Sequence, residues 1–124
     1  MDIRRINYEA SRACEQFAVV EVHPTGNGGV FIKAALQTSA GRTYVASVDL
    51  VNYPSRMPQV FITAPRLLAP PHRWQDGNIC YLHPNMWNPG RHDLTFVLAR
   101  TAKWLNKYEV WRETGNWPGA KLSH

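Results

Sequence analysis

Cysteines, acidic residues and long apolar runs are all scarce in this chain of 124 residues. The two cysteines, Cys14 and Cys80, do not show the spacing of a disulfide scaffold. No run approaches the ~18 apolar residues that a membrane span requires, and residues 1–17 lack the apolar segment of a secretory signal. These absences favour a reduced, cytoplasmic protein that does not enter a membrane.

The composition that remains indicates one globular domain spanning residues 1–124. Hydrophobic residues make up 44% of the chain and charged residues 19%, which is typical of a globular rather than a disordered protein. Most domains contain about 50 to 200 residues. The net charge of +5 favours acidic partners but does not identify them.

Periodicity predicts an α+β domain with a helix near each end. Apolar residues at steps of three and four between Ile3 and Phe17 predict an amphipathic N-terminal helix. A C-terminal helix is expected to begin after Asp93 and to stop at Gly115. Between them, apolar runs bounded by turns predict a four-stranded antiparallel meander, with strands at residues 18–23, 30–38, 43–50 and 60–63.

A long loop without convincing periodicity follows the fourth predicted strand. Residues 64–92 contain five of the nine prolines. Trp74, Tyr81 and Trp87 in this segment indicate that it packs against the domain. Long ordered loops are usually functional, and we therefore expect residues 64–92 to be the active-site loop.

Cys80 has the most reactive side chain in this loop. It follows the turn at Asp76-Gly77, which predicts a thiol presented at the surface, and His72 and His83 lie eight residues before and three after it. A nearby imidazole can lower the pKa of a thiol, stabilise an oxyanion or move a proton. Cys14 instead lies on the apolar face of the first predicted helix, and we expect it to be packed and without a functional role.

Two other interpretations of Cys80 are open at this point. A cysteine in an apolar stretch is often simply packed. A zinc site would use His72, Cys80, His83 and His92 as ligands, but only Cys80 and His83 have the short spacing of a zinc pair. The sequence therefore predicts neither a metal nor another cofactor.

Residues 53–89 resemble the core of the ubiquitin-conjugating enzymes. The stretch at 53–58 (YPSRMP) is similar to the family's Tyr-Pro-x-x-Pro-Pro, and 76–80 (DGNIC) resembles its Gly-x-Ile-Cys-Leu segment. Trp87-Asn88-Pro89 stands at the place of the Trp-Ser-Pro element. The order and spacing of these motifs imply the ubiquitin-conjugating fold and a transferase in which Cys80 forms a thioester.

The chain departs from that family before the cysteine. The family's His-Pro-Asn triplet ends eight residues upstream, where this chain has Pro70-Pro71-His72. Because the family asparagine supports the oxyanion during amine attack, the resemblance implies that role for His72, which can also change protonation near neutral pH. Asp76 and His83 flank the nucleophile and are further candidates for activating or supporting the amine.

The C-terminal third resembles a narrower bacterial group. Residues 104–111 (WLNKYEVW) and 114–119 (TGNWPG) are similar to the ending of small proteins encoded beside cGAS/DncV-like nucleotidyltransferases in cyclic-oligonucleotide anti-phage signalling (CBASS) operons. With the core motifs, the resemblance covers about residues 1–124. It implies that the C-terminus of the nucleotidyltransferase is the cargo, and that its transfer to a lysine or other amine raises the activity of the nucleotidyltransferase.

Other observations limit this function. No G-x-x-x-x-G-K-[ST] phosphate loop occurs, so the activation of a carboxylate with ATP is expected to belong to another protein. A non-catalytic binding module of the same fold, regulating a partner protein, is the alternative, and the presence of Cys80 argues against it. A nucleic-acid binder using Arg4, Arg5, Arg12 and exposed tryptophans ranks lowest, because the basic residues are spread along the chain and no RNA-binding motif occurs.

Overall fold

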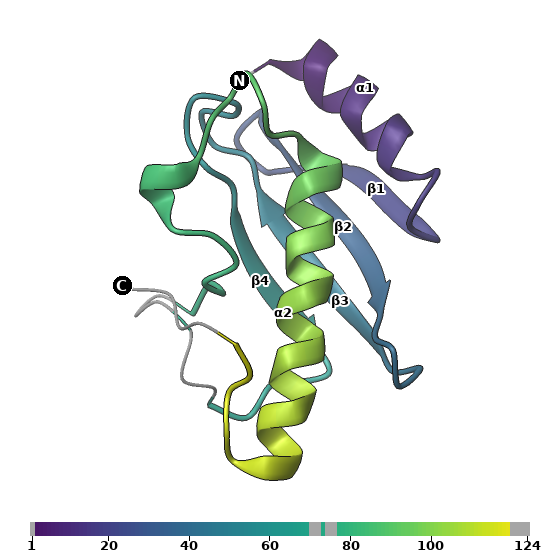
Figure 1. The fold of residues 1–124 in the computed structure, drawn as a ribbon. Helices are drawn as coiled ribbons and strands as arrows, with labels where there is room; N and C mark the ends of the chain where they lie inside the picture. The colour runs from purple at the N-terminus through teal and green to yellow at the C-terminus, as the bar shows by residue number, and fades with distance from the viewer. Residues whose placement is uncertain (1, 70–72, 74–76, 120–124) are drawn as a thin grey trace.

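The computed structural model describes residues 2–69, 73 and 77–119. Two predicted site residues, His72 and Asp76, and the aromatic Trp74 lie outside the described residues. The same holds for residues 70, 71 and 75 and for residues 1 and 120–124. Figure 1 shows a sheet with the long α2 lying across one face and α1 lying over its β1 end.

The first helix, α1, spans Ile3–Ala13. The Asp2 side chain caps it by accepting a hydrogen bond from the Arg5 backbone N–H at 3.0 Å. The helix is four residues shorter than the periodicity to Phe17 predicts, because the apolar spacing continues past the last helical turn. The prediction that Cys14 is packed is also wrong: this residue is the C-cap of α1 and is exposed. Its Sγ lies 3.5 Å from the Val20 carbonyl oxygen.

The four strands form one antiparallel meander, as the sequence predicts. They are β1 (Val19–Pro24), β2 (Val30–Gln37), β3 (Thr43–Asp49) and β4 (Gln59–Ala64), and they follow one another across the sheet in chain order. Each boundary lies within one residue of the predicted one. A register shift between Val45 and Ala46 marks an irregularity in the pairing of β3 with β4.

The C-terminal helix, α2, spans Leu94–Thr114 and begins and ends where its capping residues predict. The Asp93 carboxylate accepts a hydrogen bond from the Phe96 N–H at 2.8 Å. Gly115 ends the helix with φ of 76° and donates its N–H to the Trp111 carbonyl at 2.8 Å. A positive φ costs a residue with a side chain more than it costs glycine, which explains the glycine at this stop.

The hydrophobic core lies between α2 and the sheet. Side chains on alternate positions of β2 and β3 are buried, while their neighbours in sequence are half-buried or exposed. The remaining core side chains come from one face of α2, from α1, from β4 and from the loops on either side of β4. The fully or almost fully buried members include Ile32, Leu36, Tyr44, Val48, Val60, Leu94, Val97, Leu98, Leu105 and Tyr108.

In its described residues, the loop between β4 and α2 contains one helical element, the 3₁₀ helix η1 (Pro84–Met86). The segment before η1 returns to the sheet, because Ile79 donates its N–H to the Val60 carbonyl at 2.8 Å and forms a β-bridge with Arg73. The loop is therefore attached to the edge of β4 at the residue before Cys80.

Candidate functional site

Cys80 is buried at the centre of the loop. Only 1% of its surface is exposed, and it forms no disulfide. The expectation of an exposed thiol is therefore wrong. The bend at Gly77 does precede it, but the hydrogen bond from the Ile79 N–H to the Val60 carbonyl of β4 carries the following residues into the domain instead of out to solvent.

The residue after Cys80 anchors the loop from two sides. The Tyr81 hydroxyl donates a hydrogen bond to the Pro58 carbonyl at 2.5 Å, and the Tyr81 carbonyl accepts one from Arg100 Nε on α2 at 3.0 Å. Burial raises the pKa of the Tyr81 phenol. These contacts hold the backbone around Cys80 between β4 and α2, which makes the position of the thiol a property of the whole fold.

His83 caps the N-terminus of the 3₁₀ helix η1. Its Nδ1 accepts a hydrogen bond from the Asn85 N–H at 3.2 Å, and it is the N-cap residue of η1. Because Nδ1 acts as the acceptor, a neutral His83 carries its proton on Nε2. His83 is half-buried, and in this tautomer its Nε2–H can donate a hydrogen bond but cannot accept a proton.

His92, a ligand in the zinc alternative, also accepts a local backbone hydrogen bond through its ring. Its Nδ1 accepts the Asn88 N–H at 3.0 Å, and its ring stacks on Phe96 with a centroid distance of 4.1 Å. Within the part of the chain that the structure describes, no group of three or more His, Cys, Asp or Glu side chains is placed to hold a metal ion. His72, the fourth residue of that alternative, lies outside this part.

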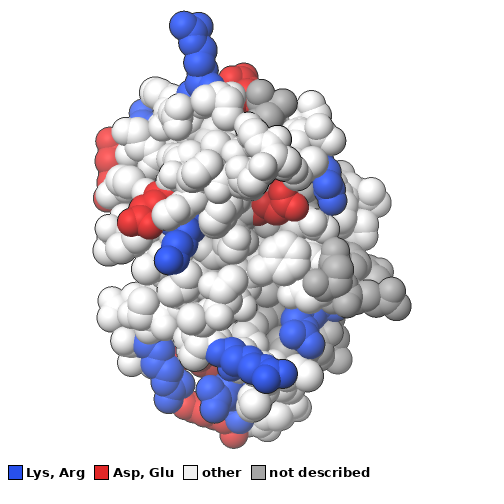
Figure 2. Space-filling view, turned by 180° about the vertical axis from the view of Figure 1, so that it is seen from behind, with Lys and Arg blue, Asp and Glu red and all other residues white. Residues whose placement is uncertain are grey.

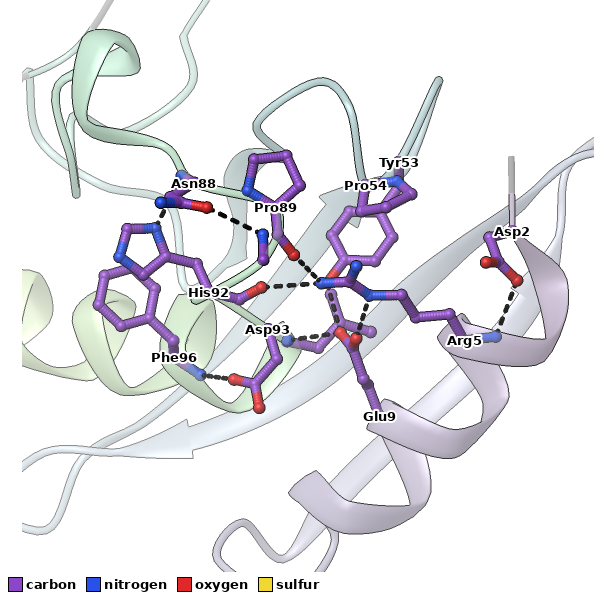
Figure 3. A network of polar contacts seen from close by, with 12 residues as sticks. Asp2, Arg5, Glu9, Tyr53, Pro54, Asn88, Pro89, His92, Asp93 and Phe96 are labelled. Atoms are coloured by element: carbon purple, nitrogen blue, oxygen red, sulfur yellow. Dashed lines mark hydrogen bonds and ion pairs between the residues drawn. The ribbon is translucent and has the colours of Figure 1, made fainter.

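A buried ionic network connects α1 to the segment that leads into α2 (Figure 3). Arg5 pairs with Glu9 through Nε, and its Nη2 donates to the carbonyls of Pro89 at 2.6 Å and of His92 at 3.0 Å. This network brings together residues more than 80 positions apart in the chain. The i,i+4 spacing of Arg5 and Glu9 was its only sequence signal, and that spacing usually marks an ordinary surface pair.

Glu9 is the centre of this network. Its Oε1 accepts hydrogen bonds from the Tyr53 hydroxyl and from the Leu94 N–H, the latter at 3.0 Å. Burial raises the pKa of Tyr53, and the neighbouring Glu9 carboxylate raises it further. Trp87 adds a second connection, since its Nε1 donates to the Pro54 carbonyl at 2.8 Å. The residues similar to the family's Tyr-Pro and Trp-Ser-Pro elements thus hold the loop in place.

Basic side chains gather in the lower part of the face that Figure 2 shows, with acidic ones at its bottom edge. On α2, burial lowers the pKa of Lys107, and the charges of Lys103 and Arg100 lower it further. Two of the arginines considered for nucleic-acid binding already have protein partners. Arg5 belongs to the buried network, and Arg12 contacts Tyr8 and Glu15, so these arginines do not form one free basic patch.

The helices of the described residues do not meet the requirements of a membrane span. None of them combines the length and the apolar composition needed to cross a bilayer. α2, the longest at 21 residues, carries charged residues along its length.

The fold is similar to that of a known ubiquitin-related domain. The structure of the Vps23 UEV, solved in a complex with ubiquitin, matches with a TM-score of 0.59 and 16% sequence identity. The match covers 82% of this chain and 81% of the UEV chain. At this identity the likeness shows the fold alone.

Sequence comparison identifies a family. No curated protein matches the chain significantly. A family model described as Type II CBASS E2 protein (E2-CBASS) matches residues 9–124, which is most of the chain and includes every candidate site residue. The chain therefore belongs to the E2-CBASS family and has the E2-like fold of that family.

Proposed function

We propose that this protein is an acyl carrier that forms a thioester through Cys80 and transfers the acyl group to an amine. The observation that carries the proposal is the position of Cys80. It is the only cysteine of the proposed active-site loop, and it follows Ile79, which is hydrogen-bonded to Val60 of β4, in a chain of the E2-CBASS family. Cys14, the other cysteine, lies at the end of α1.

The proposed reaction has two steps. In the first, the Cys80 thiolate attacks the activated C-terminal carbonyl of the cargo, a C–S bond forms, and the activating group leaves. In the second, a neutral amine attacks the thioester carbon, the C–N bond forms and the C–S bond breaks. The amine loses one proton, and the Cys80 thiolate is released for another cycle.

The second step needs support for an oxyanion and a path for the proton. His72 is the proposed oxyanion donor and Asp76 a proposed supporting residue, on the basis of their positions in the sequence. Because the His83 Nδ1 accepts a backbone N–H, the Nε2 of a neutral His83 carries a proton, and we propose His83 as a supporting donor to the oxyanion. The proton that the amine loses is proposed to pass to Asp76.

The cargo is proposed from the setting of the family. CBASS is an anti-phage signalling system, and we propose that the C-terminus of its cGAS/DncV-like nucleotidyltransferase is the acyl group. The acceptor is a lysine or another amine, and the transfer primes the nucleotidyltransferase. The activating step belongs to a separate component or is already complete when the cargo arrives.

A non-catalytic binding module is the second candidate. Two observations favour it: Cys80 is 1% exposed, and the similar solved structure is a UEV in complex with ubiquitin. A buried thiol must become accessible before it can form a thioester, whereas a binding module has no such requirement.

The two candidates are distinguished by incubating the protein with the nucleotidyltransferase of its own operon, together with any activating component, and examining adducts on non-reducing gels. A thioester on Cys80 should disappear with hydroxylamine and with thiol reductant. In Cys80→Ser the adduct should become an oxyester that resists the reductant. Cys14→Ser is the matched control and should form the adduct as the unchanged protein does.

The opposite result is equally clear. Tight binding of the nucleotidyltransferase without any adduct, in the presence of the activating component, supports the binding module and rejects the carrier. His72→Ala tests a narrower point: if loading persists while discharge to an amine slows at least about tenfold, His72 acts in the amine step.

A further inference from the structure

The segment after α2, residues 116–119, folds back onto the helix that it follows. Gly115 ends α2 with a positive φ and reverses the direction of the chain. Figure 1 shows this segment, in yellow, beside the lower end of α2. Gly119 approaches Lys107 so closely that a Cβ at position 119 would lie 3.2 Å from the Lys107 Nζ. The C-terminal segment is therefore docked on α2, and the proposed function gives it no role.

Trp117 makes the main aromatic contact of this segment. Its ring lies against that of Trp104 on α2, with a centroid distance of 5.3 Å. Trp104 in turn stacks on Tyr108 with almost parallel rings and a centroid distance of 5.8 Å. Trp104 and Tyr108 are buried, whereas Trp117 is half-buried. The three rings form a stack with Trp117 at its outer end, and ring pairs at such distances attract one another.

The inner end of this aromatic stack holds the beginning of the proposed active-site loop. The Tyr108 hydroxyl accepts a hydrogen bond from the Leu68 N–H at 2.9 Å, four residues after the end of β4. Further along the loop, Arg100 Nε donates to the Tyr81 carbonyl at 3.0 Å. Positions 100, 104 and 108 share one face of α2, because residues four apart on a helix are neighbours. One helix face thus holds the chain on both sides of Cys80.

This arrangement connects the C-terminal segment to the accessibility of the thiol. Cys80 is buried, so a reactant reaches it only when the surrounding chain opens locally. The segment between Leu68 and Tyr81 is restrained by one hydrogen bond at each end. Loss of either restraint raises the population of open states. The Leu68 restraint depends on the position of the Tyr108 ring, which Trp104 packs against.

We infer that Trp117 acts as a strap that keeps Cys80 buried, through its contact with Trp104 and the hydrogen bond between Tyr108 and Leu68. Trp117 and Tyr108 are positioning residues, because they hold the loop and take no part in bond formation. The inference rests on the proposed function in one respect, that Cys80 is the reacting thiol. It gives the C-terminal sequence at 104–119 a role in controlling that thiol.

The test measures how fast a maleimide modifies Cys80 in the full chain. The chain carries Cys14→Ser, so that Cys80 is the one remaining cysteine, and mass spectrometry follows the modification with time. Trp117→Ala should raise the rate about fivefold, because it removes the outer ring of the stack. Trp117→Phe keeps an aromatic ring against Trp104 and should restore most of the original rate.

Tyr108→Phe tests the inner end of the stack. It keeps the stacked ring but removes the acceptor of the Leu68 N–H, and it should raise the Cys80 rate at least about threefold. Combined with Trp117→Ala, it should give less than the product of the two separate increases, because both changes act on one restraint. Val110→Ala is the matched control on the exposed side of the same helix, and it should leave the rate unchanged.

Low concentrations of urea separate opening of the loop from a general loss of stability. Local opening exposes little surface and depends weakly on urea, whereas global unfolding exposes much more and depends on it strongly. The additional modification in Trp117→Ala should therefore be almost independent of urea below the unfolding transition. An increase that has the urea dependence of global unfolding overturns the inference, because Trp117 would then stabilise the domain as a whole.

The outcomes also separate the strap from the proposed function, because maleimide modification needs neither cargo nor activating component. An unchanged Cys80 rate in Trp117→Ala overturns the strap, and a thioester on Cys80 in the adduct experiment would leave the carrier function intact. A faster, urea-independent Cys80 rate in Trp117→Ala, with no thioester in the protein that retains Trp117 or in the variant, supports the strap and rejects the carrier function.

Discussion

At the scale of single residues, the sequence predicts a packed Cys14 and an exposed Cys80, and the structure shows the reverse. Cys14 follows the last residue of α1 and is exposed, while Cys80 follows a turn and is buried. Thiol chemistry depends on access as well as on pKa. The burial of Cys80 therefore makes an opening of the loop part of any reaction at this residue.

This difference predicts two rates of thiol modification. With a maleimide under native conditions, Cys14 should react at least about tenfold faster than Cys80, because Cys80 reacts only when the loop opens. Peptide mapping by mass spectrometry measures both rates. Cys14→Ser should remove the fast phase, and equal rates at the two cysteines would contradict the burial of Cys80.

The Glu9 carboxylate is the residue on which the α1 network depends. Glu9→Ala removes the partner of Arg5 and of the Tyr53 hydroxyl and should lower the free energy of unfolding by about 2 to 4 kcal/mol. Urea denaturation followed by circular dichroism measures the change.

Glu15→Ala is the matched control for this change. Glu15 pairs with Arg12 on the exposed side of the same segment, and such pairs contribute about 0 to 1 kcal/mol. A loss at Glu9 no larger than at Glu15 would show that the network does not stabilise the domain.

At the scale of elements, α2 is held to the sheet by polar contacts as well as by the core. Glu109 on α2 is 6% exposed, and its Oε2 accepts a hydrogen bond from the Tyr44 hydroxyl of β3 at 2.8 Å and contacts Arg42 at 3.4 Å. Burial and the Glu109 contact raise the pKa of Tyr44 to about 12. Two opposite effects act on the pKa of Glu109 itself.

The pKa of Glu109 determines how the free energy of unfolding is expected to change with pH. Burial acts to raise its pKa, but hydrogen bonds from Thr38, Tyr44 and Arg42 lower it below the ordinary value of 4.5. A lowered pKa means that the unfolded state binds the proton more tightly. The contribution of Glu109 is therefore complete above about pH 4.5 and is lost as the pH falls through its folded-state pKa.

Urea denaturation at pH 7 and at steps down to pH 3 tests this prediction. Glu109→Gln should be less stable at pH 7 and should lose less stability on acidification than the unchanged protein. Glu113→Gln, on the exposed side of the same helix, is the control and should follow the unchanged protein. Parallel pH profiles for the Glu109 variant and the unchanged protein would refute the assignment.

At the scale of the whole molecule, the α1 network, the core and the loop contacts join the N-terminal helix, the sheet and α2. Arg5 reaches the loop before α2, Glu9 reaches the first residue of α2, and Tyr81 is held between Pro58 and Arg100. Elements connected in this way are expected to unfold together.

The prediction is therefore a single cooperative transition for the chain. Urea unfolding monitored by tryptophan fluorescence and by far-ultraviolet circular dichroism should give coincident curves, with a slope of about 1 to 3 kcal/mol per molar urea. Separate transitions would show that the C-terminal helix or the loop forms an independent unit, contrary to one domain over residues 1–124.

The elements of this protein follow from local sequence, because caps, turns and apolar periodicity act over a few residues. Asp93 and Gly115 mark the ends of α2, and the four strands lie within a residue of their alternating runs. The order of the motifs around Tyr53, Cys80 and Trp87 indicated the ubiquitin-conjugating fold, and the C-terminal residues 104–119 indicated the CBASS group to which the chain belongs. What local spacing overestimated was the length of α1.

Tertiary structure alone decided the environment of the candidate site. The burial of Cys80 follows from the hydrogen bond between Ile79 and Val60 of β4. The position of the loop depends on contacts between distant residues, such as Trp87 with Pro54 and Arg5 with His92, which are 33 and 87 positions apart. No periodicity encodes such contacts, because they form only when distant segments pack together. The setting of Asn78 is of the same kind: the residue is buried, and its Oδ1 has no hydrogen-bond partner among the described residues, which are properties of the folded chain.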